Sequence, residues 1–526
     1  MIAGDLLGER ARLTPDNEAL VVVPGGDGGG DEAVERYSWR QLDERATRAA
    51  AAWRAMGLAP GDRVAILAHN RTEYVDAFFA AGKCGVVLVT LGTRLTAAEL
   101  APIVADSGAR VLLWDGALAE TAEALRQRCG EAGCGVERWL GLDVPGDEAD
   151  GEESWPAAVA AADPQAFVPH RADPEDPWCM LYTSGTTGEP KGVVIPHRMV
   201  IWNGYNTVCA WQLRADDVSP IFTPMYHAGG LMAFFVPLTV IGGKVVLMRQ
   251  FDASAVWRTV EAEGCTVVLG VPTIWKLLME APEFASADLS AVRWLISGGA
   301  PLPTWIADAY RERGVVFRQG FGMTEVGVNC FAMNDDDMIE KPGTLGTPMP
   351  FTEVRLVGDD GRDVPVGEVG EMWFRGPHVS TGYWNRPEAT AASRAEGGWF
   401  RSGDLGRRDE DGYYWVAGRA KDVIISGGVN VFPAEVEAVM LRAPGVRDAA
   451  LVGVEHPTWG EVGVAFVVPL DERTVDEAAL LAFLGDHLAR YKLPKEVRLV
   501  GELPRTAYGK VQKGKLVEVY QREVTG

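Results

Sequence analysis

The chain has 526 residues, of which 47% are hydrophobic and 23% are charged, and its formal net charge is −23. This length predicts more than one domain, because single cores stop growing near ~250–300 residues, and the composition argues against intrinsic disorder. The acidic balance argues against nonspecific nucleic-acid binding.

Two further observations bear on where the chain works. No apolar run reaches the ~18 residues of a membrane span. The first ten residues include acidic ones, and no basic segment precedes an apolar stretch, unlike a secretory signal. Seven cysteines, an odd number, are typical of reduced thiols rather than a disulfide scaffold, and the Cys129–Cys134 spacing has no second pair to complete a zinc site. We therefore expect a cytoplasmic protein.

The first half of the chain alternates between expected helices and short apolar strands. A helix is expected over residues 38–57, where Ser38 is a candidate N-cap and Gly57 a candidate end, and another over 71–82. Buried strands are expected at 62–70, 86–91, 111–114, 266–270 and 293–297. The run FFVPLTVIGGKVVLM at 234–248 is interpreted as strand, turn and strand. This alternation predicts a largely parallel α/β sheet.

The pattern changes beyond about residue 350. Antiparallel strands are expected at 353–365 and 368–376, which predicts a β subdomain. The last hundred residues predict a helix after Pro433, two strands at 448–454 and 462–469, and a helix at 475–490. The predicted division is a large domain at 1–420 and a small α+β domain at 421–526.

The segment LYTSGTTGEPKG at 181–192 joins hydroxyls, glycines and Lys191 in one loop. Glycines let a ligand approach the backbone, and hydroxyls and a lysine suit an anion such as a polyphosphate. A plain polar turn between strands is the alternative. The spacing does not match the P-loop, which needs four residues between its first glycine and Gly-Lys-Ser/Thr.

Four more segments follow in order, and all five together are informative: SGGAPL at 297–302, QGFGMTEVG at 319–327, the stretch 399–422 containing WFRSGDLG and GRAKD, and LPRTAYGKVQK at 503–513. Over nearly the whole chain they resemble the adenylate-forming superfamily of acyl-CoA synthetases, luciferases and nonribosomal adenylation domains. The resemblance implies an N-terminal adenylation domain and a mobile C-terminal lid. It also implies ATP, Mg²⁺ and CoA as cofactors, with an acyl-adenylate formed first and a thioester second.

The resemblance assigns catalytic roles residue by residue. Lys510 would bind both the carboxylate and the α-phosphate, Glu325 would hold Mg²⁺, and Thr324 would donate to the α-phosphate. Without the resemblance, Lys510 would be interpreted as a surface lysine and Glu325 as a helix cap. Nucleotide-binding residues would be Thr183, Ser184, Gly185, Thr186, Thr187, Lys191, Gly299, Ala300, Pro301, Phe321, Gly322, Asp404 and Arg419.

The same resemblance places the second half-reaction and the acid. Lys421 would be the hinge of the C-terminal domain, and Ser426, Gly427 and Gly428 would form part of a pantetheine tunnel. His227 would gate the acid site, a structural histidine being the alternative. Gly229, Gly230, Val271, Gly298 and Gly320 suggest a roomy apolar cavity for a bulky apolar monocarboxylic acid, whether fatty, aryl or polycyclic.

Other functions stay open at this point. An acyl-AMP ligase that loads a carrier-protein thiol shares these motifs, although no insertion typical of such ligases is visible. A catalytically inactive binding homologue and a luciferase-type oxygenase are the remaining alternatives. The sequence leaves the oligomeric state undecided, a homodimer being one possibility.

Overall fold

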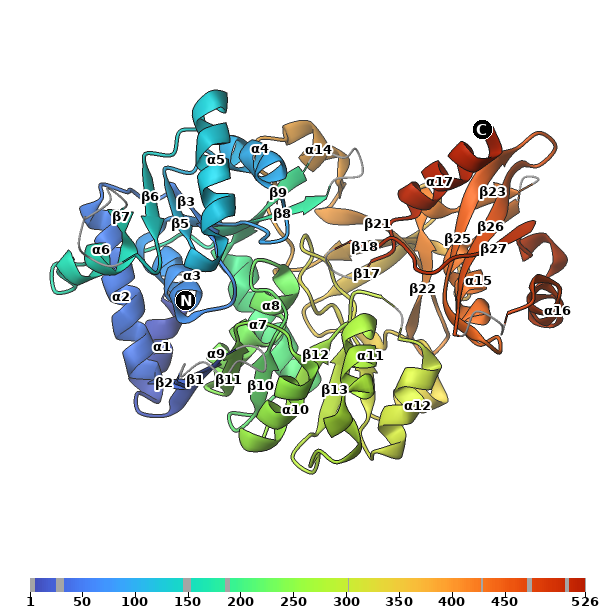
Figure 1. The fold of residues 1–526 in the computed structure, drawn as a ribbon, viewed down its shortest axis with the longest axis horizontal. Helices are drawn as coiled ribbons and strands as arrows, with labels where there is room; N and C mark the ends of the chain where they lie inside the picture. Colours follow the sequence, from blue (N-terminus) through green and yellow to red (C-terminus); the bar gives the residue numbers. More distant parts are fainter. Residues whose placement is uncertain are drawn as a thin grey trace.

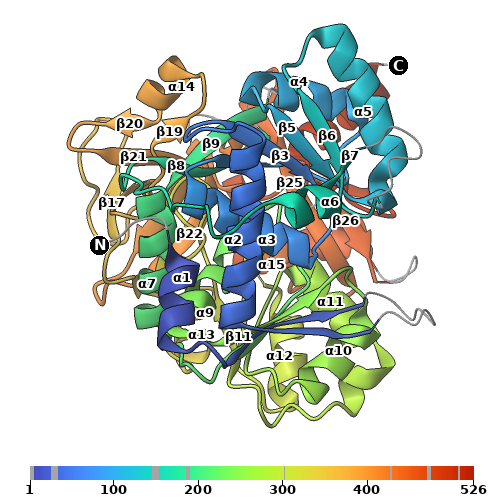
Figure 2. The same cartoon turned by 90° about the vertical axis from the view of Figure 1, so that its left-hand side faces the viewer.

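The computed structural model describes residues 5–24, 33–144, 153–184, 190–300, 302–426, 429–470, 475–506 and 510–525. Figure 1 shows the elements of the first four hundred residues gathered into one large body, with the C-terminal elements at its right-hand side. Figure 2 shows the long N-terminal helices lying across the face that is turned to the left in Figure 1.

The largest sheet in the described part of the chain has the order β19-β9-β8-β4-β3-β5-β6-β7. From β8 to β7 neighbouring strands run parallel, and β9 and β19 are added antiparallel. Strand bounds are β3 (Arg63–Leu67), β4 (Val87–Thr90), β5 (Val111–Trp114), β6 (Arg138–Gly141), β7 (Glu153–Ser154), β8 (Pro177–Ser184), β9 (Pro190–Pro196) and β19 (Gly382–Tyr383). The central strands β3 and β4 are apolar and buried almost throughout, as expected where helices cover both faces of a sheet.

The helices around this sheet begin and end at strong local signals. In α2 (Trp39–Ala55) the Ser38 side chain accepts from the Gln41 amide and the Gln41 side chain accepts from the Ser38 amide, a complete capping box. Gly85, at φ 72°, ends α3 (Thr72–Cys84) in the left-handed region. The other helices are α1 (Leu6–Leu13), α4 (Ala97–Ser107), α5 (Ala119–Ala132), α6 (Trp155–Ala161), α7 (His197–Trp211) and α14 (Pro387–Ala392).

A second region contains two further sheets. One has the order β10 (Val218–Ile221), β11 (Lys244–Met248), β1 (Glu18–Val23), β2 (Glu35–Ser38), and the other is the parallel set β12 (Val267–Gly270), β13 (Trp294–Ser297), β14 (Phe317–Gln319). Their helices are α8 (Ala228–Met232), α9 (Phe235–Ile241), α10 (Ala253–Ala262), α11 (Pro272–Glu280) and α12 (Thr304–Glu312).

The prediction of a strand in the first part of residues 234–248 is wrong, because residues 235–241 form helix α9. Residues 235–240 are all buried, so the helix has no exposed polar face and its sequence shows no helical periodicity. A short run of this kind does not distinguish a buried helix from a buried strand. The second part is strand β11, as predicted.

The β subdomain is antiparallel, as predicted. Its main sheet has the order β17 (Glu353–Val357), β18 (Gly370–Arg375), β21 (Trp399–Arg408), β20 (Arg394–Ala395), with β22 (Tyr414–Arg419) paired to β21. Two short strands, β15 (Phe331–Ala332) and β16 (Thr347–Pro348), and helix α13 (Asp337–Glu340) lie beside it in sequence.

The C-terminal elements form their own sheet and helices. The sheet order is β24 (Val429–Val431), β23 (Ile424–Ser426), β26 (Gly460–Pro469), β25 (Val446–His456), with β27 (Glu496–Leu499) paired to β26. The helices are α15 (Pro433–Met440), α16 (Glu477–His487) and α17 (Lys513–Thr525). The α/β class with a C-terminal α+β unit is therefore confirmed, while the boundary at residues 420 and 421 stays a prediction.

Within the described residues, no helix combines the length and apolar character that crossing a membrane requires.

Candidate active site

Glu325 lies in a tight turn in which the Met323 amide donates to the Gly327 carbonyl across 3.0 Å. The turn folds back closely on the chain that follows it: a Cβ at Gly322 would lie 2.3 Å from the Val328 carbonyl carbon. A glycine is therefore required there by close approach. The result is that only 8% of Glu325 remains exposed.

Tyr383 connects Glu325 to the strand that carries Lys191. Its hydroxyl donates to Oε1 of Glu325 across 3.0 Å, and Lys191 Nζ lies 5.5 Å from the centroid of its ring. Burial raises the pKa of Glu325, while the Tyr383 hydroxyl and the charges of Lys510 and Arg419 act in the opposite direction. One tyrosine thus contacts both the predicted Mg²⁺ ligand, Glu325, and a predicted nucleotide-binding residue, Lys191.

Asp404 and Arg419 face each other on β21 and β22. They are partners in the strand register, and Nε of Arg419 is 3.0 Å from Oδ1 of Asp404. Within β21, the Ser402 hydroxyl accepts from the Asp404 amide. Burial raises the pKa of Asp404, and the cations Arg419 and Lys510 oppose this.

Lys510 reaches this group from the C-terminal part of the chain. Its amide donates to the Thr506 hydroxyl, and the Thr506 amide donates to its carbonyl, so the backbone is fixed. Desolvation by the surrounding protein and the charge of Arg419 lower the pKa of Lys510, and Asp404 and Glu325 oppose both. Lys510 is nevertheless exposed to solvent. Lys510 therefore lies close enough to Arg419, Asp404 and Glu325 for their charges to act on it, and the ion pair within this group joins Arg419 to Asp404.

The predicted phosphate loop is described only at its two ends. Thr183 pairs with Lys191 and Ser184 with Pro190 in the hairpin of β8 and β9. Gly185, Thr186, Thr187, Pro301, Gly427 and Gly428 lie outside the described residues, so the predictions for them stay predictions. Ser426, before the last pair, ends β23.

Gln319 joins the two glycine-containing segments that were predicted to line the nucleotide and the acid. Its Nε2 donates to the carbonyls of Ser297 and Ala300 at 3.1 and 3.3 Å. The Gly320 amide donates to Ser297 as well, at 2.7 Å, and Gly299 has φ 79°, a conformation that favours glycine. Residues 297–300 and 319–320 therefore lie side by side.

The glycines of the predicted acid cavity differ in the space around them. A Cβ at Gly229 would meet no heavy atom within 4 Å, and one at Gly298 would meet only the Gly320 carbonyl at 4.0 Å. At Gly230 a Cβ would lie 2.3 Å from the Pro224 carbonyl oxygen. Gly229 and Gly298 thus adjoin open space, whereas Gly230 allows close backbone packing.

His227 is half-buried at the start of α8, with its ring centroid 4.3 Å from that of Tyr226. Burial lowers the pKa of His227 well below its usual value, and the charges of Lys510 and Arg94 lower it further. The imidazole is therefore neutral at pH 7, close enough to Lys510 to sense its charge. Val271 is the N-cap of α11 and lies beside Gly299, where a Cβ would be 3.6 Å from the Cγ1 of Val271.

Three other predicted residues have simpler surroundings. Phe321 stacks on Phe374, with centroids 5.9 Å apart, so part of its ring belongs to the core of the β subdomain. Thr324 is half-buried in the Glu325 turn, and Lys421 is exposed in a short 3₁₀ helix, η3 (Ala420–Asp422). The roles predicted for these three stay predictions.

Sequence reasoning missed Gln319 and Tyr383. Gln319 directly precedes Gly-Phe-Gly, and a polar amide beside a glycine turn is a local signal for backbone bonding. Tyr383 has no such signal, because its partner Glu325 is 58 residues away.

Residues 7–384 match the family model described as AMP-binding enzyme, and residues 435–510 match its C-terminal domain model. The feruloyl-CoA synthase of an Amycolatopsis species is 42% identical over 507 residues, covering 96% of both chains. A long-chain-fatty-acid–CoA ligase of Mycobacterium tuberculosis is 36% identical over 521 residues, covering 99% of both. A solved structure of an anthranilate CoA ligase with anthranoyl-AMP has a TM-score of 0.88 at 27% identity, over 99% of this chain and 97% of the other.

Proposed function

This chain belongs to the AMP-binding enzyme family and is an AMP-forming acid–thiol ligase, and from this premise we propose that it converts a bulky apolar monocarboxylic acid to its CoA thioester at the expense of ATP. The observation that supports the proposal most directly is that Lys510 lies within reach of the charges of Glu325, Asp404 and Arg419, of which Arg419 is paired with Asp404. These four groups match what the reaction needs.

In the first half-reaction a carboxylate oxygen attacks the α-phosphorus of ATP, and the bond to pyrophosphate breaks. Two anions must approach each other, so positive charge between them lowers the barrier. A unit charge about 4 Å from a phosphate oxygen contributes ~4 kcal/mol at an effective dielectric of ~20. Lys510 would supply this charge, while Asp404 and Arg419 would bind the ribose hydroxyls and Thr324 the α-phosphate.

We propose Mg²⁺ as the metal and Glu325 as its protein ligand. No group of three or more metal-binding side chains occurs among the described residues. That fits an ion which takes one or two carboxylates from protein and its other ligands from phosphates and water. When bound, the ion would neutralise phosphate charge. Tyr383 would hold the Glu325 carboxylate in place through Oε1.

In the second half-reaction the CoA sulfur attacks the acyl carbonyl carbon, AMP leaves, and the thiol proton passes to solvent. Lys510 must first withdraw. Rotation about exposed Lys421 would remove it and bring Ser426, Gly427 and Gly428 toward the acyl group. Neutral His227 at the cavity would not compete with Lys510 for the carboxylate.

The size of the acid is inferred from the space beside Gly229 and Gly298. The printed names of two relatives, a feruloyl-CoA synthase and a long-chain-fatty-acid–CoA ligase, describe acids with large apolar parts. Aryl acids of ferulate size and long-chain fatty acids are therefore the first compounds to assay.

The test compares wild type with Lys510→Met, using acid-dependent pyrophosphate release with and without CoA. Losing ~4 kcal/mol predicts a fall in adenylation of about a thousand-fold, while thioester formation from supplied acyl-adenylate stays largely intact. Lys515→Met, at an exposed lysine of α17, is the matched control. Full-speed adenylation by Lys510→Met would refute the proposal.

A further inference from the structure

Asn70, which follows strand β3, holds a segment far away in the sequence. Its Nδ2 donates to the carbonyls of Thr223 at 3.0 Å and Met248 at 3.2 Å, and its Oδ1 accepts from the Met225 amide at 2.8 Å. The side chain is 4% exposed. Nδ2 and Oδ1 of this buried amide therefore both bind backbone groups that are far away in the sequence.

Thr90, the last residue of β4, makes a similar contact with the next residue of the same segment, Tyr226. Its hydroxyl donates to the Tyr226 carbonyl across 2.9 Å, and it too is buried. Strands β3 and β4 are parallel neighbours, so both side chains come from the carboxyl edge of the same sheet. In open α/β sheets this edge commonly borders the ligand site. Here it holds the segment that leads into His227.

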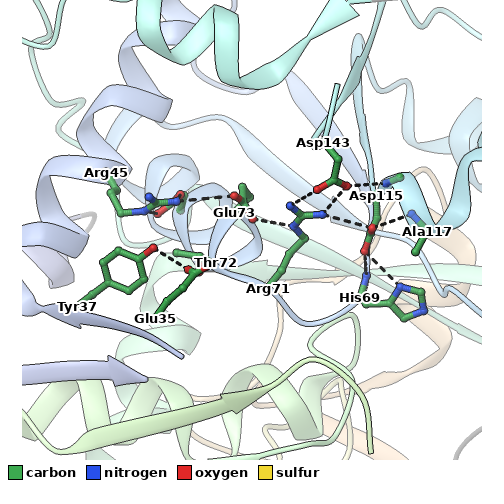
Figure 3. Close-up of polar contacts among 12 residues, drawn as sticks. Glu35, Tyr37, Arg45, His69, Arg71, Thr72, Glu73, Asp115, Ala117 and Asp143 are labelled. Atoms are coloured by element: carbon green, nitrogen blue, oxygen red, sulfur yellow. Dashed lines mark hydrogen bonds and ion pairs between the residues drawn. The ribbon is translucent and has the colours of Figure 1, made fainter. Parts of the chain in front are cut away.

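The backbone on both sides of Asn70 is itself fixed (Figure 3). His69 Nδ1 lies 3.2 Å from Asp115 Oδ2, and Arg71 donates to Asp143 Oδ1 across 2.8 Å. These contacts join the loops after β3, β5 and β6. Because both of its neighbours are held in place, Asn70 has little freedom to move, and its side chain can fix the position of the backbone groups that it binds.

The held segment continues directly into the predicted acid cavity. The His227 amide donates to the Pro224 carbonyl across 3.2 Å, and a Cβ at Gly230 would lie 2.8 Å from the Thr223 carbonyl oxygen. Close packing of this kind means that a shift of residues 223–226 also moves His227 and the start of α8, where Gly229 adjoins open space.

We propose that Asn70 and Thr90 are positioning residues for the acid: they hold residues 223–226 so that His227 and Gly229 keep the shape of the acid cavity. This inference rests on the proposed function. It predicts an effect on the acid that is separate from any effect on ATP, because neither residue belongs to the group formed by Glu325, Asp404 and Lys510.

The experiment uses Thr90→Val, which removes one hydroxyl at nearly constant shape, and Asn70→Asp, which removes both donors. Pyrophosphate release is measured with the acid and ATP varied separately. Loss of one buried hydrogen bond predicts a fall in kcat/KM for the preferred acid of about five-fold or more, with the KM for ATP within about two-fold. The ranking of aryl and fatty acids should change as well.

The matched control is Thr239→Val. Thr239 is equally buried, and its hydroxyl donates to the Phe235 carbonyl inside α9, also across 2.9 Å. Thr239→Val should lower the free energy of unfolding by about as much as Thr90→Val does, while its kcat/KM for the acid stays unchanged. If Thr90→Val alters acid and ATP parameters no more than Thr239→Val does, the inference is overturned and the proposed function stands. If wild type releases no pyrophosphate with any acid, the proposed function is refuted, and this inference with it.

Discussion

Replacing His197 should remove a pH-dependent part of the stability. His197 is fully buried at the start of α7, with its ring centroid 4.7 Å from that of Trp178. Among the described residues neither of its ring nitrogens has a hydrogen-bond partner. Burial lowers the pKa of His197 to about 4, against a smaller opposing effect of Asp176 and with a further lowering by His170.

The sign follows from which state binds the proton. An unfolded histidine has a pKa of ~6.5, so between about 4 and ~6.5 the unfolded chain is protonated and the folded chain is not. The free energy of unfolding therefore rises with pH through this window, and the contribution is lost as pH falls. The shift corresponds to about 3 kcal/mol in total, of which about 2 kcal/mol should disappear between pH 7 and pH 5.

Urea unfolding at pH 7 and pH 5, followed by tryptophan fluorescence, measures this loss for wild type, His197→Phe and His197→Gln. On going from pH 7 to pH 5, the free energy of unfolding of each His197 variant should fall by about 2 kcal/mol less than that of wild type. Asp76, whose pKa burial raises to about 6, titrates in the same range but is common to all the proteins. His487→Gln, at an exposed histidine, is the control. Equal losses in all four proteins would show that the His197 reasoning is wrong.

Two further predictions concern the candidate site. Tyr383→Phe removes the hydrogen bond to Glu325 but keeps the ring under Lys191, so the Mg²⁺ concentration needed for half-maximal adenylation should rise several-fold, in line with about 1 kcal/mol for one hydrogen bond. An unchanged Mg²⁺ titration would count against this role. Gly229→Leu should fill the proposed acid cavity and reduce kcat/KM for bulky acids at least ten-fold more than for acetate. Gly230→Ala should lower the melting temperature, because its Cβ would collide with the backbone. Equal losses for large and small acids with Gly229→Leu would contradict the assignment of the cavity.

Local signals were sufficient wherever a residue acts on its own neighbours. The helix predicted from Ser38 begins at Trp39 with a capping box, since the capping partners are only three residues apart. The predicted strands at 62–70, 86–91, 266–270 and 293–297 are present with slightly shorter ends, because a buried parallel strand is apolar throughout. The exception is α9, where burial on every side removed the periodicity that identifies a helix.

The order and spacing of the motifs determined the family, and with it the expectation that Lys510, Glu325, Asp404 and Arg419 belong to one site. Only the tertiary structure decided the long-range contacts in and around the site: Tyr383 binds Glu325, Gln319 bonds to Ser297 and Ala300, and Asn70 bonds to Thr223, Met225 and Met248. The physical reason is that a hydrogen-bond partner brought by another strand depends on sheet order and register. A pattern of polar and apolar residues records that a side chain is buried, but not which distant backbone group it meets there.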